Sequence, residues 1–220
     1  ANDVTIDLNG FTLEGLGSGT GIQVSAFMEN VTVRNGVVRG WGGAGVQLEN
    51  HAVVEGVRAA QNGGAGIITG SWSLVSDCEA SNNGSRGISV ESHSVVRNSM
   101  ARYNGTSDGE AGIYAGMASV VESCTAYSNG GDGIEAALAA VVVHSTATDN
   151  SGAGIRGGHT TKIDGGVAHN NHDLGIAVGD NGVVTDSVAY FSGSVGIWSG
   201  KAAIVRGSTT GENVGAGIET

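Results

Sequence analysis

Apolar and polar residues alternate along this chain in short stretches, and the stretches themselves repeat. A glycine followed by isoleucine or valine returns about every 21 residues from residue 21 onward. Each repeat is numbered here from this glycine, which is therefore position 1. The position-1 glycines are Gly21, Gly45, Gly66, Gly87, Gly112, Gly133, Gly154, Gly175, Gly196 and Gly217.

Other positions of the repeat keep their residue type. Position 2 is isoleucine or valine throughout. Position 10 is valine or isoleucine from Val54 to Val205, position 15 is alanine from Ala59 to Ala189, and position 18 is asparagine from Asn62 to Asn213 except at Ser192. Apolar residues fall at positions 2 and 4, 8 and 10, and 13 and 15. An interval of two is the period of a strand with one buried face, so each repeat predicts about three short strands.

Strands that recur at a fixed spacing predict a solenoid, in which equivalent residues of successive coils stack about 4.8 Å apart. The expected fold is all-β: a single-stranded parallel β-helix of about ten 21-residue coils, forming one domain over residues 1–220. Residues 1–20 are expected to close the N-terminal end as a partial coil, and residues 21–220 to form the regular coils. Spacings of 24 and 25 residues predict short insertions around Phe27 and within residues 105–110.

The glycines and asparagines that recur in the repeat have a physical explanation. Glycine at position 1 suits either a positive φ or a close approach of two backbones. Asparagine at position 18 tolerates the left-handed region, and stacked amides can hydrogen-bond from coil to coil. The chain has no proline, which fits strands that all need their N–H donors.

The repeated Asn-x-Gly-x-Gly-Ile pattern, as in Asn129-Gly130-Gly131-Asp132-Gly133-Ile134, resembles the right-handed parallel β-helix family, the pectin-lyase-like superfamily. The resemblance covers nearly the whole chain. It implies a right-handed coil and an association with acidic polysaccharides. A left-handed β-helix is excluded because 21 is not a multiple of its six-residue period. A calcium-binding nonapeptide roll is excluded because its motif is echoed only once.

Charge and composition remove other classes of protein. The chain has 21 acidic and 10 basic residues, a net charge of −11, which argues against a nucleic-acid partner. No apolar run reaches the ~18 residues of a membrane span. Cys78 and Cys124 share position 13 with Ser99 on the coil between them, so they should be about 9.6 Å apart and unbonded. An extracellular or cell-surface location is expected.

The chemical signatures of β-helix enzymes are missing. Polygalacturonase-like members are expected to carry Asp-Asp, Gly-His-Gly and Arg-x-Lys, and none of these occurs. The Asp-Pro-His-Asp signature of mannuronan epimerases needs a proline. No metal site and no cofactor is expected, and the catalytic residues, if there are any, stay unknown. The turns are almost all minimal, whereas a water-excluded active site needs walls.

Two rows of outward side chains are the candidate carbohydrate-binding residues. Tyr114, Glu135 and Arg156 occupy position 3 of successive coils, where Glu beside Arg either binds a sugar acid or forms an ordinary cross-strand ion pair. Tyr127, His169 and Tyr190 occupy position 16, flanked by Tyr103 and Phe191. These aromatic side chains either stack on sugar rings or pack against neighbouring turns.

Histidines give weaker candidates. His51, Trp72 and His93 form a third row at position 7, most simply as surface packing. Glu91 with His93 has the composition of an acid/base pair, but no third group is visible. His159, His169, His172 and Asp173 lie in one coil, although their spacing matches no metal-binding template.

The sequence therefore predicts a non-catalytic β-helix module, structural or carbohydrate-binding, with a polysaccharide as its possible partner. The alternative is a lyase, epimerase or hydrolase acting on an acidic polysaccharide, so whether the protein is an enzyme stays open. Ile218 aligns with the core isoleucines but only two residues follow it. Because a solenoid needs a cap at each end, we expect this coil to be covered either by the same end of a second copy, in end-to-end self-association, or by further chain.

Overall fold

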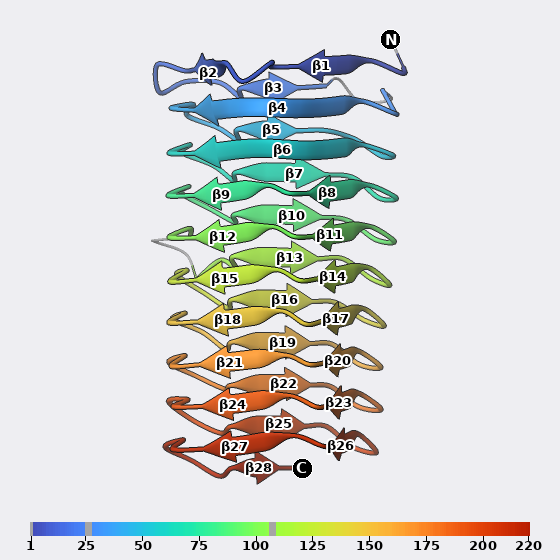
Figure 1. Ribbon diagram of the computed structural model, residues 1–220, viewed down its shortest axis with the longest axis vertical. Helices are drawn as coiled ribbons and strands as arrows, with labels where there is room; N and C mark the ends of the chain where they lie inside the picture. Colours follow the sequence, from blue (N-terminus) through green and yellow to red (C-terminus); the bar gives the residue numbers. More distant parts are fainter. Residues whose placement is uncertain (1, 25–27, 106–108) are drawn as a thin grey trace.

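The computed structural model describes residues 2–24, 28–105 and 109–220, and in these residues the chain winds as a continuous β-helix (Figure 1). They form 28 strands and no helix, and successive coils pair in parallel. The all-β solenoid predicted from the repeat is confirmed. Both predicted insertions lie largely outside the described residues. No helix long and apolar enough to cross a membrane occurs in the described part of the chain.

One wall of the β-helix is a ten-stranded parallel sheet, called sheet B here, which contains positions 2 to 4 of each repeat. Its strands are β3 (Ile22–Gln23), β5 (Val46–Gln47), β7 (Ile67–Thr69), β10 (Ile88–Val90), β13 (Ile113–Ala115), β16 (Ile134–Ala136), β19 (Ile155–Gly157), β22 (Ile176–Val178), β25 (Ile197–Ser199) and β28 (Ile218–Glu219). Each strand pairs residue for residue with the equivalent strand 21 or 25 positions on, or 24 in the first coil.

The other walls belong to one 18-stranded sheet, called sheet A, which consists of two ladders. The first ladder contains β1 (Thr5–Asp7), β8 (Leu74–Ser76), β11 (Val95–Arg97), β14 (Val120–Glu122), β17 (Val141–Val143), β20 (Lys162–Asp164), β23 (Val183–Thr185) and β26 (Ile204–Arg206). The second contains β2 (Thr12–Glu14), β9 (Glu79–Ser81), β12 (Met100–Arg102), β15 (Thr125–Tyr127), β18 (Thr146–Thr148), β21 (Val167–His169), β24 (Val188–Tyr190) and β27 (Thr209–Gly211). The long strands β4 (Thr32–Arg39) and β6 (Val53–Ala60) run through both ladders and join them.

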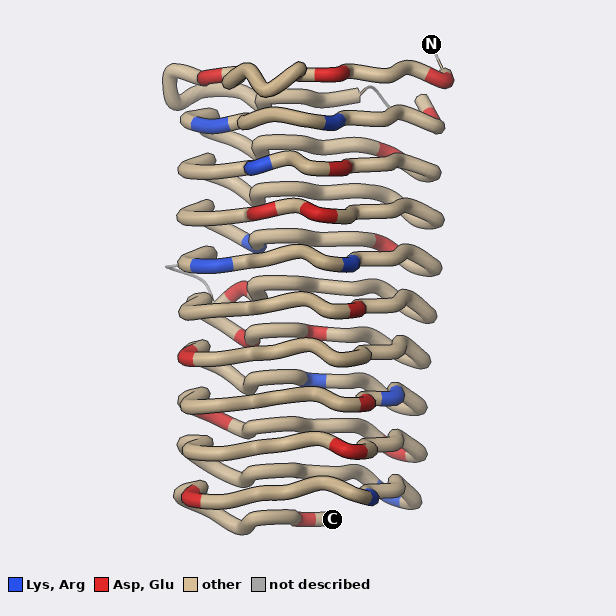
Figure 2. The backbone as a smooth tube through the Cα atoms, in the orientation of Figure 1, with Lys and Arg blue, Asp and Glu red and all other residues tan. Residues whose placement is uncertain are grey.

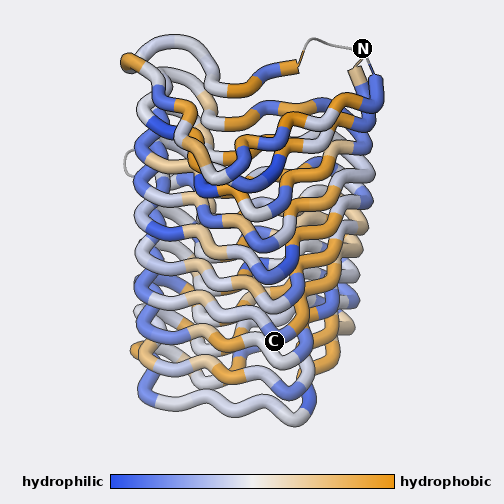
Figure 3. The backbone as a smooth tube through the Cα atoms, turned by 45° about the horizontal axis from the view of Figure 1, so that its top comes forward, coloured by the Kyte–Doolittle hydropathy of each residue, from blue (hydrophilic) through white to orange (hydrophobic). Residues whose placement is uncertain are grey.

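The core consists of rows of identical residues that run along the axis of the β-helix. Ile134 of sheet B, Val142 of the first ladder and Ala147 of the second are each fully buried, and so are their equivalents in the neighbouring coils. Hydrophobic positions accordingly recur at the same place in successive coils (Figure 3). Large side chains from two walls therefore meet small alanines from the third, which is how a narrow coil is filled without voids.

Each coil turns its three corners in the same way. In the eight coils that begin at Gly45 to Gly196, positions 7, 12 and 17 have a positive φ, as at Ala139, His144 and Asp149. Position 1 does not, and neither does the asparagine at position 18. The expectation that Asn takes the left-handed region is therefore wrong by one residue: the residue before it does so.

The residue after a corner is in many coils tied to the next coil by a side chain, although some, such as Ala140, donate to a carbonyl three residues back. At position 18 the Asn83 backbone N–H and the Asn83 side-chain amide both donate to Oδ1 of Asn104, at 3.1 and 2.9 Å. Serines do the same at the other corners, where the N–H of Ser73 donates to Oγ of Ser94 and that of Cys78 to Oγ of Ser99. The buried asparagines thus stack from coil to coil with hydrogen bonds between neighbours, and serines accept similar bonds at other corners.

The glycine at position 1 makes room for the asparagine at position 18 of the same coil. A Cβ built on Gly133 would lie 2.6 Å from Nδ2 of Asn150 and 2.7 Å from the carbonyl oxygen of Gly154. The glycine is therefore required for close approach and not for a positive φ.

The two cysteines are buried and unbonded, as the spacing predicts. Burial raises the pKa of the Cys78 thiol to about 12 and that of Cys124 to about 11. Neither is poised as a reactive thiolate.

The C-terminal coil has a core residue that is partly exposed. β28 pairs with β25, and Ile218 is 47% exposed whereas the equivalent Ile197 is fully buried. End-to-end self-association through this coil stays a prediction.

Ser192 interrupts the buried asparagine row, and restoring the row should stabilise the fold. The Ser192 hydroxyl is buried without a hydrogen-bond partner among the described residues. An asparagine there would accept from Asn171 and reach Asn213 of the next coil. We expect Ser192→Asn to raise the free energy of unfolding in urea by about 1–2 kcal/mol.

The matched control for this substitution is the reverse change in an intact coil, Asn150→Ser. It removes the side-chain hydrogen bond that Asn150 donates to Asn171 and the two that it accepts from Asn129, and it should cost about 1–3 kcal/mol. If both variants destabilise the protein equally, the asparagine row does not hold the coils together.

Candidate functional site

The outward face of sheet B carries the first predicted row. Tyr114 of β13 pairs with Glu135 of β16, and Glu135 pairs with Arg156 of β19. All three side chains are partly exposed. The alignment across coils is as the repeat predicts.

Arg156 does not pair with its neighbour Glu135 but with two aspartates from the turns that lead into sheet B. Its Nε donates to Oδ2 of Asp132 at 2.6 Å, and one Nη donates to Oδ2 of Asp173 at 3.3 Å. The hydrogen bond to Asp132 is the main reason that the pKa of Arg156 is raised. The cross-strand ion pair expected between Glu135 and Arg156 is therefore not formed.

Glu135 is a half-buried carboxyl with no ion pair or hydrogen bond to another described residue. Burial raises its pKa above the ordinary value for glutamate. The positive charge of Arg86 opposes this rise, and the negative charge of Asp132 adds to it. Burial therefore shifts Glu135 toward its protonated form relative to an ordinary glutamate.

Tyr114 is covered on one face by an arginine. The guanidinium carbon of Arg86 lies 4.1 Å from the centre of the Tyr114 ring, and Nε of Arg86 lies 2.7 Å from Oε2 of Glu110. This cation–π contact leaves less of the ring free for a ligand than the sequence suggests.

A further exposed aromatic side chain on this face, which the candidate rows do not include, is Trp198. It occupies position 3, two coils beyond Arg156 with Ala177 between them, and is 38% exposed. Beside it lies a cavity of about 360 Å³, lined by Arg156, Asp173, Leu174, Ser194, Val195, Trp198 and Glu219. Trp198 belongs to the same position-3 row as Tyr114, Glu135 and Arg156, and the row is interrupted only by Ala177.

The second predicted row lies on a different wall. Tyr127, His169 and Tyr190 belong to the second ladder of sheet A, and Thr148 separates the first of them from the other two. Two of these rings contact aromatic side chains at the corners. The ring of Tyr127 lies edge-on to that of Tyr103, with ring centres 5.4 Å apart, and the ring of His169 lies edge-on to that of Phe191, with ring centres 5.2 Å apart. The six predicted carbohydrate-binding residues are therefore not brought together into one site.

The histidines are engaged separately. Trp72 and His93 stack with ring centres 4.2 Å apart, and no described contact joins His93 to Glu91. His159 lies 3.7 Å from Asp180, whereas His169 packs against Phe191 on another wall. In the described parts of the chain, no group of three His, Cys, Asp or Glu side chains is placed to hold a metal ion.

Glu135 gives a pH-dependent prediction. Because the pKa of Glu135 is raised in the folded state, protonation of its carboxyl stabilises the folded protein. This stabilisation is complete below the pKa that Glu135 has in the unfolded chain, and it is lost as the pH rises through the pKa that it has in the folded protein. Glu135→Gln should therefore raise the melting temperature at pH 7 and leave it unchanged near pH 3.5. Glu122→Gln, at an exposed carboxyl on β14, is the control. A destabilised Glu135→Gln protein at pH 7 would show that the charged carboxylate is needed for stability.

Three solved structures of similar fold show what this chain resembles. An alginate lyase from a Paenibacillus species has a TM-score of 0.70 at 16% identity, with 98% of this chain and 91% of that one covered. The A-module of a mannuronan C-5 epimerase from Azotobacter vinelandii has a TM-score of 0.60 at 14% identity, over 100% of this chain and 62% of that one. The catalytic unit of an α-1,3-glucanase from Streptomyces thermodiastaticus has a TM-score of 0.66 at 16% identity, with 91% of this chain and 46% of that one covered.

At these identities the likeness shows the fold, and the chain spans only about half to two thirds of the epimerase module and the glucanase unit. No curated protein matches the chain. The family model described as right-handed beta helix region matches residues 2–116 and again residues 102–220. Since the two matches together span residues 2–220, the chain belongs to the right-handed β-helix family, with the pectin-lyase-like fold.

Proposed function

We propose that this protein is a carbohydrate-binding β-helix that holds an extended polysaccharide along the outer face of sheet B without cleaving it. The observation that carries the proposal is the cavity of about 360 Å³ beside Trp198. An exposed indole gives a sugar ring an apolar platform, and the surrounding Asp173, Ser194 and Glu219 offer acceptors for its hydroxyl groups.

The charges on this face favour an uncharged glycan. Arg86 and Arg156 are its basic residues, and both are already paired with carboxylates. Glu110, Asp132, Glu135, Asp173 and Glu219 make the face acidic. A polysaccharide rich in carboxylates would be repelled here, so the proposal departs from the sugar-acid site expected around Glu135 and Arg156.

The absence of walls supports binding over catalysis. The turns that line the cavity, such as residues 171–175 and 192–196, belong to regular 21-residue coils without insertions. Such turns leave a bound sugar open to water, whereas catalysis by charged groups gains most from a closed site. A binding module for long polysaccharides belongs outside the cell, and we include an extracellular or cell-surface location in the proposal.

One observation favours a second candidate, an enzyme that acts on the same bound glycan. Glu135 is a half-buried carboxyl with a raised pKa and no ion pair, on the outer face of sheet B, which is the residue type that serves as an acid in general acid–base catalysis. Incubation with neutral and acidic polysaccharides, followed by reducing-end and unsaturated-product assays, tests this. Product that forms with the parent protein and disappears in Glu135→Gln would establish the enzyme.

The binding proposal predicts a difference between two exposed tryptophans. Trp198→Ala should abolish, or weaken about tenfold or more, the retardation of the protein in native gels that contain a neutral polysaccharide. Trp72→Ala removes a more exposed indole, 59% against 38%, from another wall and should leave retardation unchanged.

Glucans, mannans and galactans form the neutral panel for this assay. Equal retardation of both variants would place the glycan away from sheet B. A parent protein that none of the gels retards would remove the proposal.

A further inference from the structure

One corner of the β-helix, between sheet B and the first ladder of sheet A, has an exposed apolar surface. It is formed by positions 6 and 7 of four successive coils, in the turns that lead into β8, β11, β14 and β17 at the right-hand edge of Figure 1. This surface is called the apolar corner here and is defined by Trp72, His93, Met117, Ala118, Leu138 and Ala139.

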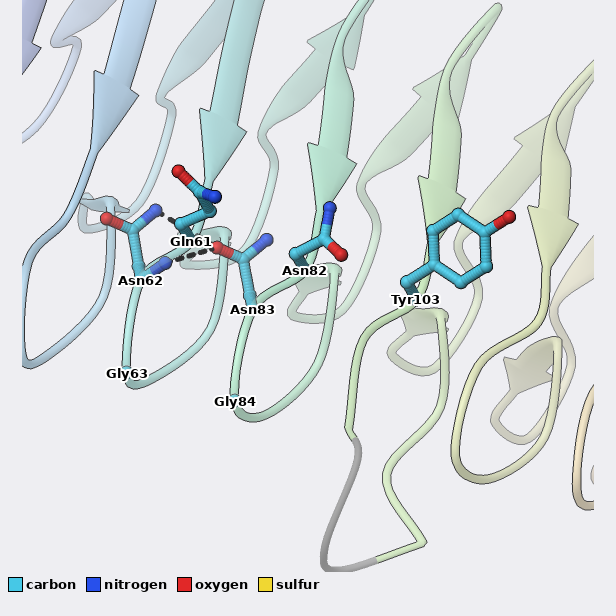
Figure 4. Close-up of a pocket in the computed structure, with 7 residues that line it drawn as sticks. All are labelled: Gln61, Asn62, Gly63, Asn82, Asn83, Gly84 and Tyr103. Atoms are coloured by element: carbon cyan, nitrogen blue, oxygen red, sulfur yellow. Dashed lines mark hydrogen bonds between the residues drawn. The ribbon is translucent and has the colours of Figure 1, made fainter.

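The apolar corner exposes large side chains that no described residue covers. Trp72, Met117 and Leu138 are 59, 44 and 45% exposed. Corners of this solenoid are not apolar as a rule, because position 17 has the same left-handed backbone and carries the polar Gln61 and Asn82 (Figure 4). A contiguous exposed apolar surface on a soluble protein marks a site of contact with another molecule.

The apolar surface continues from the corner onto the outer face of the first ladder. Position 9 faces outward there, since it alternates with the fully buried position 10. Over the same four coils it is occupied by partly buried aliphatic residues: Leu74, Val95, Val120 and Val141. The apolar corner is therefore one edge of a wider apolar strip.

The order of side chains along the apolar corner is complementary to itself. From coil to coil, position 7 carries two rings and then two methyl groups: Trp72, His93, Ala118 and Ala139. Position 6 carries two small side chains and then two large ones: Ser71, Ser92, Met117 and Leu138. Large and small residues thus change places between the second and the third of these coils.

A second copy of the chain fits this order. If a two-fold axis crosses the surface between the second and third coils, perpendicular to the β-helix axis, each row faces the same row in reverse order. Trp72 would then face Ala139 of the second copy, and Leu138 would face Ser71. Every large side chain would meet a small one, as close packing requires.

The charges beside the apolar corner obey the same symmetry. At position 11, Arg97 of β11 is paired in the ladder with Glu122 of β14, and Figure 2 shows this basic and this acidic strand on neighbouring coils. Both side chains are exposed, and neither forms an ion pair or a hydrogen bond with a described residue. The two-fold axis would place Arg97 opposite Glu122 of the second copy, and Glu122 opposite its Arg97.

These charges also select the direction of the second copy. If the two β-helices ran parallel, each coil would face its own equivalent, so Arg97 would face Arg97 and Glu122 would face Glu122. Juxtaposed like charges disfavour such a pairing. An antiparallel arrangement therefore satisfies both the sizes and the charges of the rows.

The extent of the matching surface predicts weak association. Four coils cover about 19 Å along the axis, so the contact falls at the low end of specific interfaces, near ~1,200 Å² in total. Farther out, Glu55 would face Asp164, although Asp164 already accepts a hydrogen bond of 3.0 Å from Lys162. The net charge of −11 on each copy also opposes association.

We propose that the apolar corner is the contact surface of an antiparallel, two-fold symmetric dimer of this chain. The contact is side by side, and because it is isologous it closes at two copies. It is distinct from end-to-end association through the last coil, and it does not depend on the binding of a glycan to sheet B.

Sedimentation velocity over a range of protein concentrations tests the dimer. Between about 5 and about 500 µM, the sedimentation coefficient of the parent protein should rise and level off at the value of a dimer, with a Kd of ~10–100 µM. Met117→Asp and, separately, Leu138→Asp would bury an unpaired carboxylate in the contact and should raise the Kd about tenfold or more. Melting curves at the lowest concentration show whether each variant is folded.

A charge exchange tests the symmetry itself. Arg97→Glu sets like charges against each other twice per dimer and should raise the Kd about tenfold or more. Arg206→Glu is the matched control, because it changes the net charge equally at an exposed arginine of the same row, on β26, and should associate as the parent does. The double variant Arg97→Glu/Glu122→Arg restores opposite charges and the parent's net charge, and it should recover the dimer.

Three results overturn the proposal. The first is a parent protein that stays monomeric over the whole range, and the second is an Arg97→Glu variant that associates like Arg206→Glu. The third is association that continues beyond two copies, or that Ile218→Asp removes while Met117→Asp does not. In that case the contact lies at the end of the β-helix and not along its side.

Discussion

The structure depends on how each coil turns its corners. A coil can stack on the next only if the strand ladder is interrupted three times per coil without leaving a buried N–H unpaired. Here a left-handed residue makes the turn. At the asparagine corners and at several others the following residue gives its N–H to a side-chain oxygen of the next coil, whereas at corners such as that before Ala140 it donates to a carbonyl three residues back. At the most regular corner this acceptor is an asparagine, and the glycine at position 1 leaves space for it. In the Asn-x-Gly-x-Gly-Ile pattern, the asparagine therefore supplies the acceptor, and the glycine before the isoleucine leaves space for it.

This constraint decides where chemistry can be placed. Inward positions are fixed by packing, so variation is confined to outward positions of the strands and to the left-handed corners. Stacking then aligns such positions about 4.8 Å apart, and any site is a row that crosses several repeats. One row on sheet B combines carboxylates with Trp198, and another runs along the apolar corner.

Periodicity predicted the parts of this structure that depend on stacking alone. The inward isoleucine, valine and alanine rows, the unbonded cysteines and the succession of Tyr114, Glu135 and Arg156 all follow from a 21-residue register. The partners of Arg156 did not follow, because Asp132 and Asp173 lie in turns, where strand alternation does not fix side-chain direction. The left-handed corners were missed because residues such as Trp72, Tyr103 and Ala139 occupy them in place of glycine. Trp198 was missed because Ala177 interrupts its row.

The central functional claim is that sheet B is the glycan-binding wall, and the three tryptophans allow it to be tested in one spectrum. Trp198 lies on sheet B, Trp72 at a corner of another wall, and the indole nitrogen of Trp41 is buried. In a ¹⁵N-labelled sample titrated with neutral oligosaccharides, the account predicts that the Trp198 indole N–H signal shifts while those of Trp72 and Trp41 stay in place. A shift of Trp72 alone, or no shift with any glycan, would contradict it.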